Sequence, residues 1–375
     1  MPPTLADVAV IGGGLSGLMA ALLLEQQGTH DVALFEARPG LGGRIASMDA
    51  AGAPVDCATP ALDRFDLGPT WFWPDYQPQL ARLVRDLGLT CFEQYDRGDM
   101  LIERFAGEPA LRRPGLRSAP ASVRLSGGTG ALIAALHERL DARRIHVGHA
   151  VRRLHRAADH VELEVENARG EIACWRARQV LLALPPRLAA SRLAFEPALP
   201  AELLRDWLAT PTWMAPHAKY VAVYERPFWR DMGLSGDAQS RHGPLVEIHD
   251  VSMPGGHAAL FGFVGVPATA RRGLPAQVLQ THCREQFARL FGPAAAHPLA
   301  DGLKDWAADP LTATDADQDA AGHHVAAPPA RPASGPWSAC LAGIGSEWSA
   351  EYPGYLAGAV DAAARGVRAA LGASA

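Results

Sequence analysis

The apolar residues near the start of the chain form two short runs separated by a helical pattern. Residues 8–11 are wholly apolar, which is typical of a strand buried inside a parallel sheet. Apolar residues then recur at helical spacing from residue 18 until Gly28, which is expected to end the helix. A second strand is predicted over residues 31–37, in which residues 32–35 are apolar. This order predicts a parallel βαβ unit at the start of an α/β fold.

The middle of the chain changes to the alternating pattern that is typical of strands. Residues 145–156 predict a strand that ends near Val151, and residues 160–182 predict a hairpin of half-buried strands. Residues 256–268 predict a strand in the centre of a further sheet.

Three other segments carry apolar residues at helical spacing. Residues 78–89 and 276–292 each predict an amphipathic helix. Residues 125–140 contain a glycine pair followed by a predicted helix, whose apolar stripe is more typical of packing than of a binding site. The stripes consist of Leu80, Leu83, Val84 and Leu87, of Val278, Cys283, Phe287 and Leu290, and of Leu132, Leu136 and Leu140.

Composition and charge exclude several classes of protein. The 375 residues are 48% hydrophobic and carry a formal net charge of −5 without a basic tract, so nucleic acid is not an expected partner. The first strand begins almost at the N-terminus, which leaves no room for a secretory leader, and no apolar run approaches the ~20 residues of a membrane span. Five scattered cysteines fit a reducing compartment. We expect a soluble, cytoplasmic protein, and its oligomeric state stays open.

Glycines at fixed spacing lie between the first strand and the first helix. Gly12, Gly14 and Gly17 fit GxGxxG, in which the glycines allow a tight turn, close approach of the backbone to a pyrophosphate, and close packing of helix on strand. The free N–H groups of the helix start would face the same anion. Glu36, 19 residues after Gly17, is placed to accept hydrogen bonds from ribose hydroxyls. We therefore predict dinucleotide binding rather than another glycine-rich turn, without separating NAD from FAD.

A second glycine pair follows Glu36. The stretch "EARPGLGGRIAS" contains Gly42 and Gly43, which allow another close approach to a cofactor, and Arg44, a forked donor for phosphate. Together with "IGGGLSGLMAALLL", it resembles the FAD-binding start of the flavin amine oxidase superfamily, which includes monoamine, polyamine and L-amino-acid oxidases. The resemblance also implies FAD contacts from Leu15, Ser16, Ala37 and Arg38.

The resemblance extends across most of the chain. The segment "FDLGPTWFW" resembles a turn that lies along the flavin in this family, whereas Phe72 within it is expected in the core. Val151 falls on a position whose backbone faces the adenine. The contacts implied by the turn come from Gly68, Pro69, Thr70 and Trp71.

A lysine stands out in the segment "HAKYVAVYERPFWRDMGLSG". Lys219 falls on a family position that holds a water near the flavin N5, where a cation or its water would assist hydride arrival and reoxidation by dioxygen. Of 35 lysine and arginine residues only Lys219 and Lys304 are lysine, so a solvent-facing lysine at a strand edge is the less expected alternative. His217 shares its strand face and either lines the site or packs.

The C-terminal segment "LAGIGSEWSAEYPGYLAGAV" resembles the last strand, the Ser/Thr–Glu pair and the final helix of the same family. The resemblance places Glu347 near the ribityl–phosphate part of FAD, Tyr355 against the flavin ring, and Leu356 in contact with the cofactor. The N–H groups of the final helix would face the pyrimidine end of the flavin, where negative charge develops on reduction. The implied catalytic residues are Lys219 and Tyr355.

Two departures from the family pattern concern the cofactor and the substrate. No cysteine lies between Trp306 and Cys340, so we predict noncovalent FAD rather than the covalent attachment of some members. Residues 312–316 are not aromatic, so one wall of the aromatic cage that receives the amine is missing. His323–His324 has no further ligand at useful spacing, and we expect a loop there and no metal site.

These observations predict an α/β fold of two domains. A Rossmann-like FAD-binding domain of the glutathione-reductase and amine-oxidase type would carry an inserted substrate domain of mixed sheet and helices. By resemblance, the FAD-binding domain takes residues 1–73, 123–190 and 303–375, and the substrate domain takes residues 74–122 and 191–302.

The leading functional hypothesis is an FAD-dependent amine oxidase. It would take a hydride from the carbon next to an amine nitrogen and pass the electrons to dioxygen, giving an imine and hydrogen peroxide. Because the aromatic cage is incomplete, a desaturase, an isomerase or an NAD(P)H-fed reductase with a non-amine substrate is the alternative. A binding protein with structural FAD is a third hypothesis, disfavoured by the joint presence of Lys219, Glu347 and Tyr355.

Overall fold

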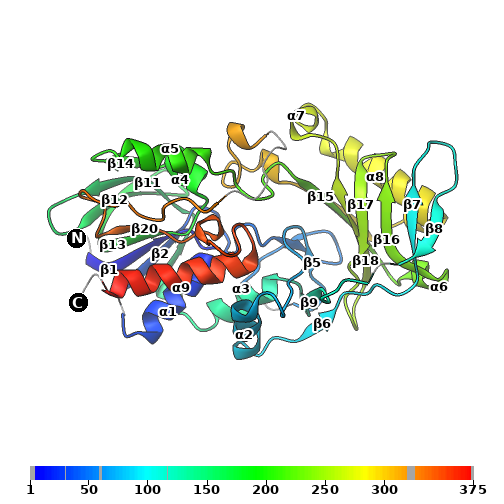
Figure 1. The fold of residues 1–375 in the computed structure, drawn as a ribbon, viewed down its shortest axis with the longest axis horizontal. Helices are drawn as coiled ribbons and strands as arrows, with labels where there is room; N and C mark the ends of the chain where they lie inside the picture. Colours follow the sequence, from blue (N-terminus) through cyan, green and yellow to red (C-terminus); the bar gives the residue numbers. More distant parts are fainter. Residues whose placement is uncertain (1–4, 30, 59–60, 116, 319–325, 373–375) are drawn as a thin grey trace.

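The computed structural model describes residues 5–29, 31–58, 61–115, 117–318 and 326–372. Two large β-sheets lie beside each other in these residues, and helices pack on each sheet (Figure 1). None of the helices in these described ranges is long and apolar enough to cross a bilayer.

The first sheet is built around the N-terminal βαβ unit. Its strands are β1 (Leu5–Ile11), β2 (Val32–Glu36), β10 (Ile145–Val147), β11 (His149–Arg156), β12 (Val161–Asn167), β13 (Ile172–Leu182), β14 (Ala194–Glu196) and β20 (Leu341–Gly343). They run in the order β10-β2-β1-β13-β12-β11-β14, and β20 also pairs with β13. β1 is parallel to β2 and β13, whereas β12 is antiparallel to β11 and β13.

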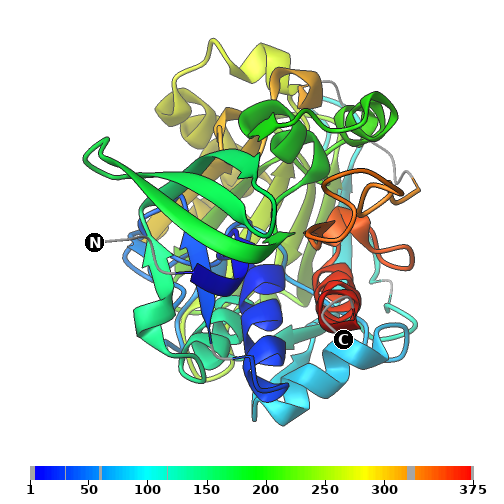
Figure 2. The same cartoon turned by 90° about the vertical axis from the view of Figure 1, so that its left-hand side faces the viewer.

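Helices cover both faces of the first sheet. They are α1 (Leu15–Gln26), α3 (Gly130–His137), α4 (Pro186–Arg192), α5 (Ala201–Ala209) and α9 (Leu356–Gly372). α1, α3 and α9 pack on one face, and α4 and α5 pack on the other (Figures 1 and 2). Because a parallel sheet is buried on both faces, Val8 and Val10 enter one apolar cluster and Ala9 and Ile11 enter the other.

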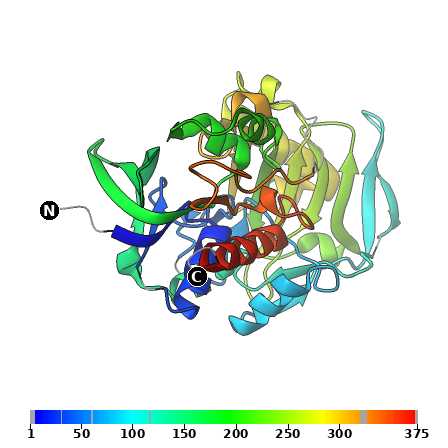
Figure 3. The same cartoon turned by 60° about the vertical axis from the view of Figure 1, so that its left-hand side comes forward.

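The second sheet is mostly antiparallel. Its strands are β7 (Asp99–Glu103), β8 (Leu111–Pro114), β15 (Ala218–Tyr224), β16 (Leu234–Ser240), β17 (Leu245–Asp250), β18 (Ala258–Val264) and β19 (Ala300–Asp305). They run in the order β19-β15-β18-β17-β16-β7-β8. Helix α8 (Ala276–Phe291) packs on one face through Cys283 and Phe287 (Figure 3).

Short elements connect the strands of the two large sheets along the chain. They are α2 (Pro78–Asp86), α6 (Phe228–Asp231), α7 (Ala268–Arg271), β3 (Ser47–Met48), β4 (Pro54–Val55), β5 (Phe65–Asp66), β6 (Cys91–Glu93) and β9 (Val123–Leu125). β3, β4 and β5 form a small sheet, and β6 pairs with β9.

The predicted hairpin and the central strand β18 are confirmed, whereas three details were wrong. The strand predicted over residues 145–156 is two strands, because Gly148 turns the chain with a φ of 67° and β11 continues beyond Val151. Val278 is exposed and does not belong to the buried stripe of α8. Leu140 packs from the turn that follows α3, which ends at His137.

The residue bounds of the two domains remain a proposal. If each large sheet marks one domain, residues 194–196 belong with the first sheet and residues 300–305 with the second. The boundary at residue 190 would then move beyond α5, which packs on the first sheet, and the boundary at residue 303 would move by a few positions.

Candidate active site

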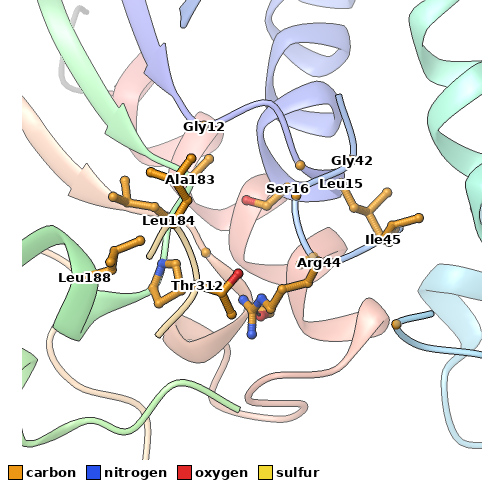
Figure 4. A pocket seen from close by; sticks show the side chains of 18 of the residues that line it. Gly12, Leu15, Ser16, Gly42, Arg44, Ile45, Ala183, Leu184, Leu188 and Thr312 are labelled. Atoms are coloured by element: carbon orange, nitrogen blue, oxygen red, sulfur yellow. Dashed lines mark hydrogen bonds between the residues drawn. The ribbon is translucent and has the colours of Figure 1, made fainter. Parts of the chain in front are cut away.

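A cavity of about 650 Å³ lies between the two large sheets. Figure 4 shows Gly12 and Ser16 on one side of it, Ala183 and Leu184 beside them, and the Arg44 side chain directed into it. Residues that are widely separated in the sequence therefore meet at one site. The predicted residues on its wall are Gly12, Gly14, Leu15, Ser16, Glu36, Ala37, Arg38, Gly42, Gly43, Arg44, Gly68, Pro69, Thr70, Trp71, Val151, Lys219, Tyr355 and Leu356.

The turn between β1 and α1 brings backbone N–H groups to this cavity. Gly12 starts the turn with a φ of 114°, a conformation that residues with a side chain rarely adopt. α1 begins at Leu15 without a side-chain cap, so its first N–H groups are available to an anion. Gly17 lies behind the wall. A Cβ there would come within 1.9 Å of the Gly12 carbonyl oxygen, so glycine is needed for helix and turn to pack.

Glu36 is held by two backbone donors at the end of β2. Its carboxylate accepts hydrogen bonds from Gly13 N and Arg38 N, each 2.7 Å long. Burial raises the pKa of Glu36, and the two N–H donors oppose that rise. The carboxylate is therefore fixed beside the glycine turn, where a ribose would find an acceptor for its hydroxyls.

Arg44 and Glu347 form a bidentate ion pair with N···O distances of 2.5 and 2.9 Å. Glu347 also accepts a hydrogen bond from Trp213 N at 3.2 Å. Burial raises the pKa of Glu347, but the Arg44 guanidinium outweighs burial, and the pKa lies below its usual value. Arg44 is on the cavity wall and Glu347 is behind it. Glu347 thus orients Arg44, and direct contact of Glu347 with a cofactor stays a prediction.

Lys219 is buried on β15, with 3% of its surface exposed, and is no solvent-facing edge residue. Its Nζ donates to Thr70 Oγ1 at 2.6 Å and to Gly68 O at 3.2 Å, and lies 3.9 Å from the centroid of the Phe261 ring. Burial lowers the pKa of Lys219 to about 7, against the opposing charge of Asp66. The cavity wall therefore carries a group that exchanges a proton near neutral pH.

Three aromatic side chains meet on the cavity wall. The Trp213 and Tyr355 rings lie 5.8 Å apart with planes inclined by 35°, and Trp73 meets Tyr355 edge-on at 6.4 Å. Met214, next to Trp213, has a φ of 61°, and a Cβ at Gly354 would come within 2.3 Å of the Trp213 Cβ. No local pattern in the sequence marks Trp213, because its position depends on these tertiary contacts.

Other residues named from the sequence also have definite places. His217, Trp306 and Thr312 line the cavity, and its lining includes no cysteine. Burial lowers the pKa of His217, and the nearby charge of Arg271 adds to this. In the part of the chain that the structure describes, no group of three His, Cys, Asp or Glu side chains is placed to hold a metal ion. The pair His323–His324 lies outside the described residues.

Two known protein families match parts of the chain. Residues 91–371 match the family described as flavin containing amine oxidoreductase. The chain belongs to this family. Residues 10–87, which include the end of β1 together with α1 and β2, match an NAD(P)-binding Rossmann-like domain.

Individual relatives extend over nearly the whole chain. Putrescine oxidase from Kocuria rosea is 25% identical over 411 residues, which cover 82% of this chain and 83% of the relative. A solved structure of putrescine oxidase bound to putrescine superposes with a TM-score of 0.78 at 21% identity, covering 99% of this chain and 100% of that one. Cyclohexylamine oxidase from Brevibacterium oxydans superposes with a TM-score of 0.77 at 20% identity, covering 100% and 99%. The predicted α/β two-domain fold with a Rossmann-like domain is confirmed.

The cofactor of this FAD-dependent oxidoreductase is FAD, and the cavity fits it. Gly14 and Gly42 form a bridge, so the two glycine turns lie side by side on the wall. Gly42 and Gly43 have φ values of 115° and 60°, which present their backbone to the cavity. The cavity therefore offers the three features that a dinucleotide requires. These are free helix N–H groups for the pyrophosphate, a carboxylate acceptor for the ribose, and glycine backbone that the cofactor can approach closely.

Proposed function

We propose that the protein is an amine oxidase that uses dioxygen and releases hydrogen peroxide. Bound FAD would accept a hydride at N5 from the carbon next to a neutral amine and pass both electrons to dioxygen. The substrate leaves as an imine, which water hydrolyses. The observation that carries this proposal is the meeting of Lys219, Tyr355 and Trp213 on the wall of the cavity that holds the glycine turns.

The chain's own residues supply orientation, charge and exclusion of water. Tyr355 and Trp213 place two aromatic rings on the cavity wall, which suits a neutral or protonated amine. Lys219 places a donor beside Gly68 and Thr70, where it would hold a water or an anionic oxygen. No side chain is needed to remove a proton from carbon, because a hydride leaves with its electrons.

Trp213 supplies an aromatic ring that the sequence comparison left missing opposite Tyr355. Residues 312–316 offer no aromatic ring to face Tyr355, and of these Thr312 lies on the wall. Trp213, from a different segment, lies beside Tyr355 instead. We infer that Trp213 and Tyr355 together receive the substrate amine.

The alternative keeps FAD and changes the substrate. The absence of an aromatic residue at 312–316 favours a desaturase, an isomerase or an NAD(P)H-fed reductase. One anaerobic titration separates these proposals. Benzylamine, cyclohexylamine, putrescine, NADH and NADPH are added in turn while the visible flavin band is followed. Bleaching by an amine, with recovery and peroxide formation in air, supports the amine oxidase. Bleaching by a nicotinamide alone refutes it.

Two further points belong to this proposal. FAD is held noncovalently, since no cysteine lines the cavity, so acid precipitation should leave all flavin in the supernatant.

A cytoplasmic location is proposed because all five cysteines are free thiols.

Replacing Trp213 by alanine is expected to lower kcat/KM for amines about tenfold, mainly through KM. The reason is the loss of one ring from the aromatic pair, worth about 1 kcal/mol or more. The Trp213→Phe variant keeps a ring and should retain most of the activity. Steady-state peroxide release measures both variants. An alanine variant with unchanged KM for every accepted amine would exclude Trp213 from substrate binding.

A further inference from the structure

Lys219 belongs to a cluster of buried charges behind the cavity wall. Asp66, Arg124 and Lys219 come from β5, β9 and β15, and none of the three is more than 4% exposed. Lys219 alone among them lines the cavity. Isolated charges are costly to bury, so such a cluster persists only where its members compensate one another.

Hydrogen bonds of Asp66 and Lys219 fix the two ends of the short segment 66–70. Thr129 donates to Asp66 Oδ1 from its backbone N at 2.9 Å and from Oγ1 at 2.8 Å, and the same Oγ1 lies 3.1 Å from Pro69 O. Lys219 donates to Thr70 Oγ1 at the other end. The carboxylate and the ammonium are therefore fixed around the segment 66–70, which forms part of the cavity wall.

Two charged side chains, Asp66 and Arg124, act on the pKa of Lys219 in opposite directions. Asp66 raises the pKa of Lys219 against the effect of burial, whereas Arg124 lowers it. Arg124 is itself held by the carbonyl oxygens of Ser252 and Val251. From β18 Lys219 meets the Phe261 ring.

The neighbouring strand β19 carries the second lysine. Lys304 is the register partner of Lys219, but its Nζ lies 2.7 Å from Asp309 Oδ2 and is occupied there. Of the groups that face Lys219, Asp66 supplies the negative charge.

We propose that Asp66 is a positioning residue of the active site, whose carboxylate stabilises the charged form of Lys219 on the cavity wall. A nearby opposite charge favours the charged form of its partner, and the low polarity of a buried site strengthens the effect. Burial raises the pKa of Asp66 and the Lys219 charge opposes the rise, so each group supports the ionised form of the other. The importance of the Lys219 charge for turnover rests on the proposed function. The electrostatic link between Asp66 and Lys219 does not depend on that function.

The scarcity of lysine allows a direct test. Purified FAD-bound protein labelled with lysine carrying 13C at Cε contains two labelled side chains, Lys219 and Lys304, and Lys304→Arg leaves only the signal of Lys219. We expect its chemical shift to titrate near pH 7. In Asp66→Asn, which keeps the shape and an acceptor for Thr129, the midpoint should fall by about one pH unit or more. In Arg124→Gln it should rise.

The two variants shift the midpoint in opposite directions, which a general loosening of the fold would not do. A Lys219 midpoint that is the same in wild type and Asp66→Asn overturns the inference. If Asp66→Asn does not fold, a fall or no change in Arg124→Gln overturns the electrostatic cluster on its own.

A kinetic measurement then separates this inference from the proposed function. The pH profile of flavin reduction by an accepted amine should move with the Lys219 midpoint in Asp66→Asn. A shifted midpoint with an unmoved profile supports the link between Asp66 and Lys219 and refutes the role of Lys219 in turnover.

Discussion

Replacing Glu36 by alanine is expected to give a protein that keeps little FAD through purification. The carboxylate sits against the glycine turn, accepts bonds from Gly13 N and Arg38 N, and faces the cavity where the ribose would lie. Hydrogen bonds to a charged group contribute about 1.5–3 kcal/mol each, so losing one or two ribose bonds should raise the Kd for FAD about a hundredfold. The ratio of flavin to protein absorbance, and fluorescence titration of the stripped protein with FAD, measure the change.

A matched variant separates cofactor binding from general damage. Glu25 lies in α1, pairs with Arg144 at 3.1 Å and is not on the cavity wall, so Glu25→Ala should bind FAD like the wild type. Glu36→Gln keeps one acceptor oxygen and should fall between wild type and Glu36→Ala. If Glu36→Ala contains as much FAD as Glu25→Ala, the ribose role of Glu36 is wrong.

The cofactor-binding part of the site could be predicted because local spacing determines it. In the βαβ unit, turn, helix start and acidic residue follow from about thirty consecutive positions, and the structure brings Gly12, Glu36 and Gly42 to one cavity. Gly17 was predicted to allow close packing, and a Cβ added there would lie only 1.9 Å from the Gly12 carbonyl oxygen, so a side chain is excluded. Buried strands also leave clear patterns, so β18 could be placed in the centre of its sheet.

Residues that depend on tertiary contacts could not be predicted. Trp213 reaches the cavity because Met214 adopts a positive φ and Gly354 leaves room, which are facts of packing between distant segments. The contact of Glu347 with the cofactor stays a prediction, but its ion pair with Arg44, 303 residues away, could not be predicted from the sequence. Asp66 shows no pattern either, since its electrostatic link with Lys219 exists only once β5 and β15 are folded together.

Replacing Lys219 by methionine is expected to slow flavin reduction or reoxidation about a hundredfold while FAD stays bound. Lys219 is the cation on the cavity wall beside Gly68 and Thr70, and a positioned cation or proton donor contributes a factor of this order. Methionine has a similar length and suits the buried site. Stopped-flow records of anaerobic reduction by an amine, and of reoxidation in aerated buffer, measure the two half-reactions separately.

Lys304→Met is the matched control for this experiment. Lys304 is the register partner of Lys219 on β19, but it pairs with Asp309 and does not line the cavity. Its loss should leave both half-reactions within about twofold of wild type, as expected for a partly exposed ion pair. Equal rates in Lys219→Met and wild type would remove Lys219 from the mechanism.

The same substitution should change how stability depends on pH. In the unfolded chain Lys219 keeps its proton up to about pH 10.5, whereas burial lowers its pKa to about 7 in the folded protein. Between these values the unfolded state binds more protons, so the free energy of unfolding of the wild type rises with pH across this window. Lys219→Met lacks this contribution. Relative to that variant, the wild type should gain about 3 kcal/mol in free energy of unfolding between pH 7 and pH 9.5, as urea unfolding at the two pH values would show. A constant difference would mean that Lys219 keeps its proton in the folded protein throughout this range, and the pH-dependent role proposed for it would not hold.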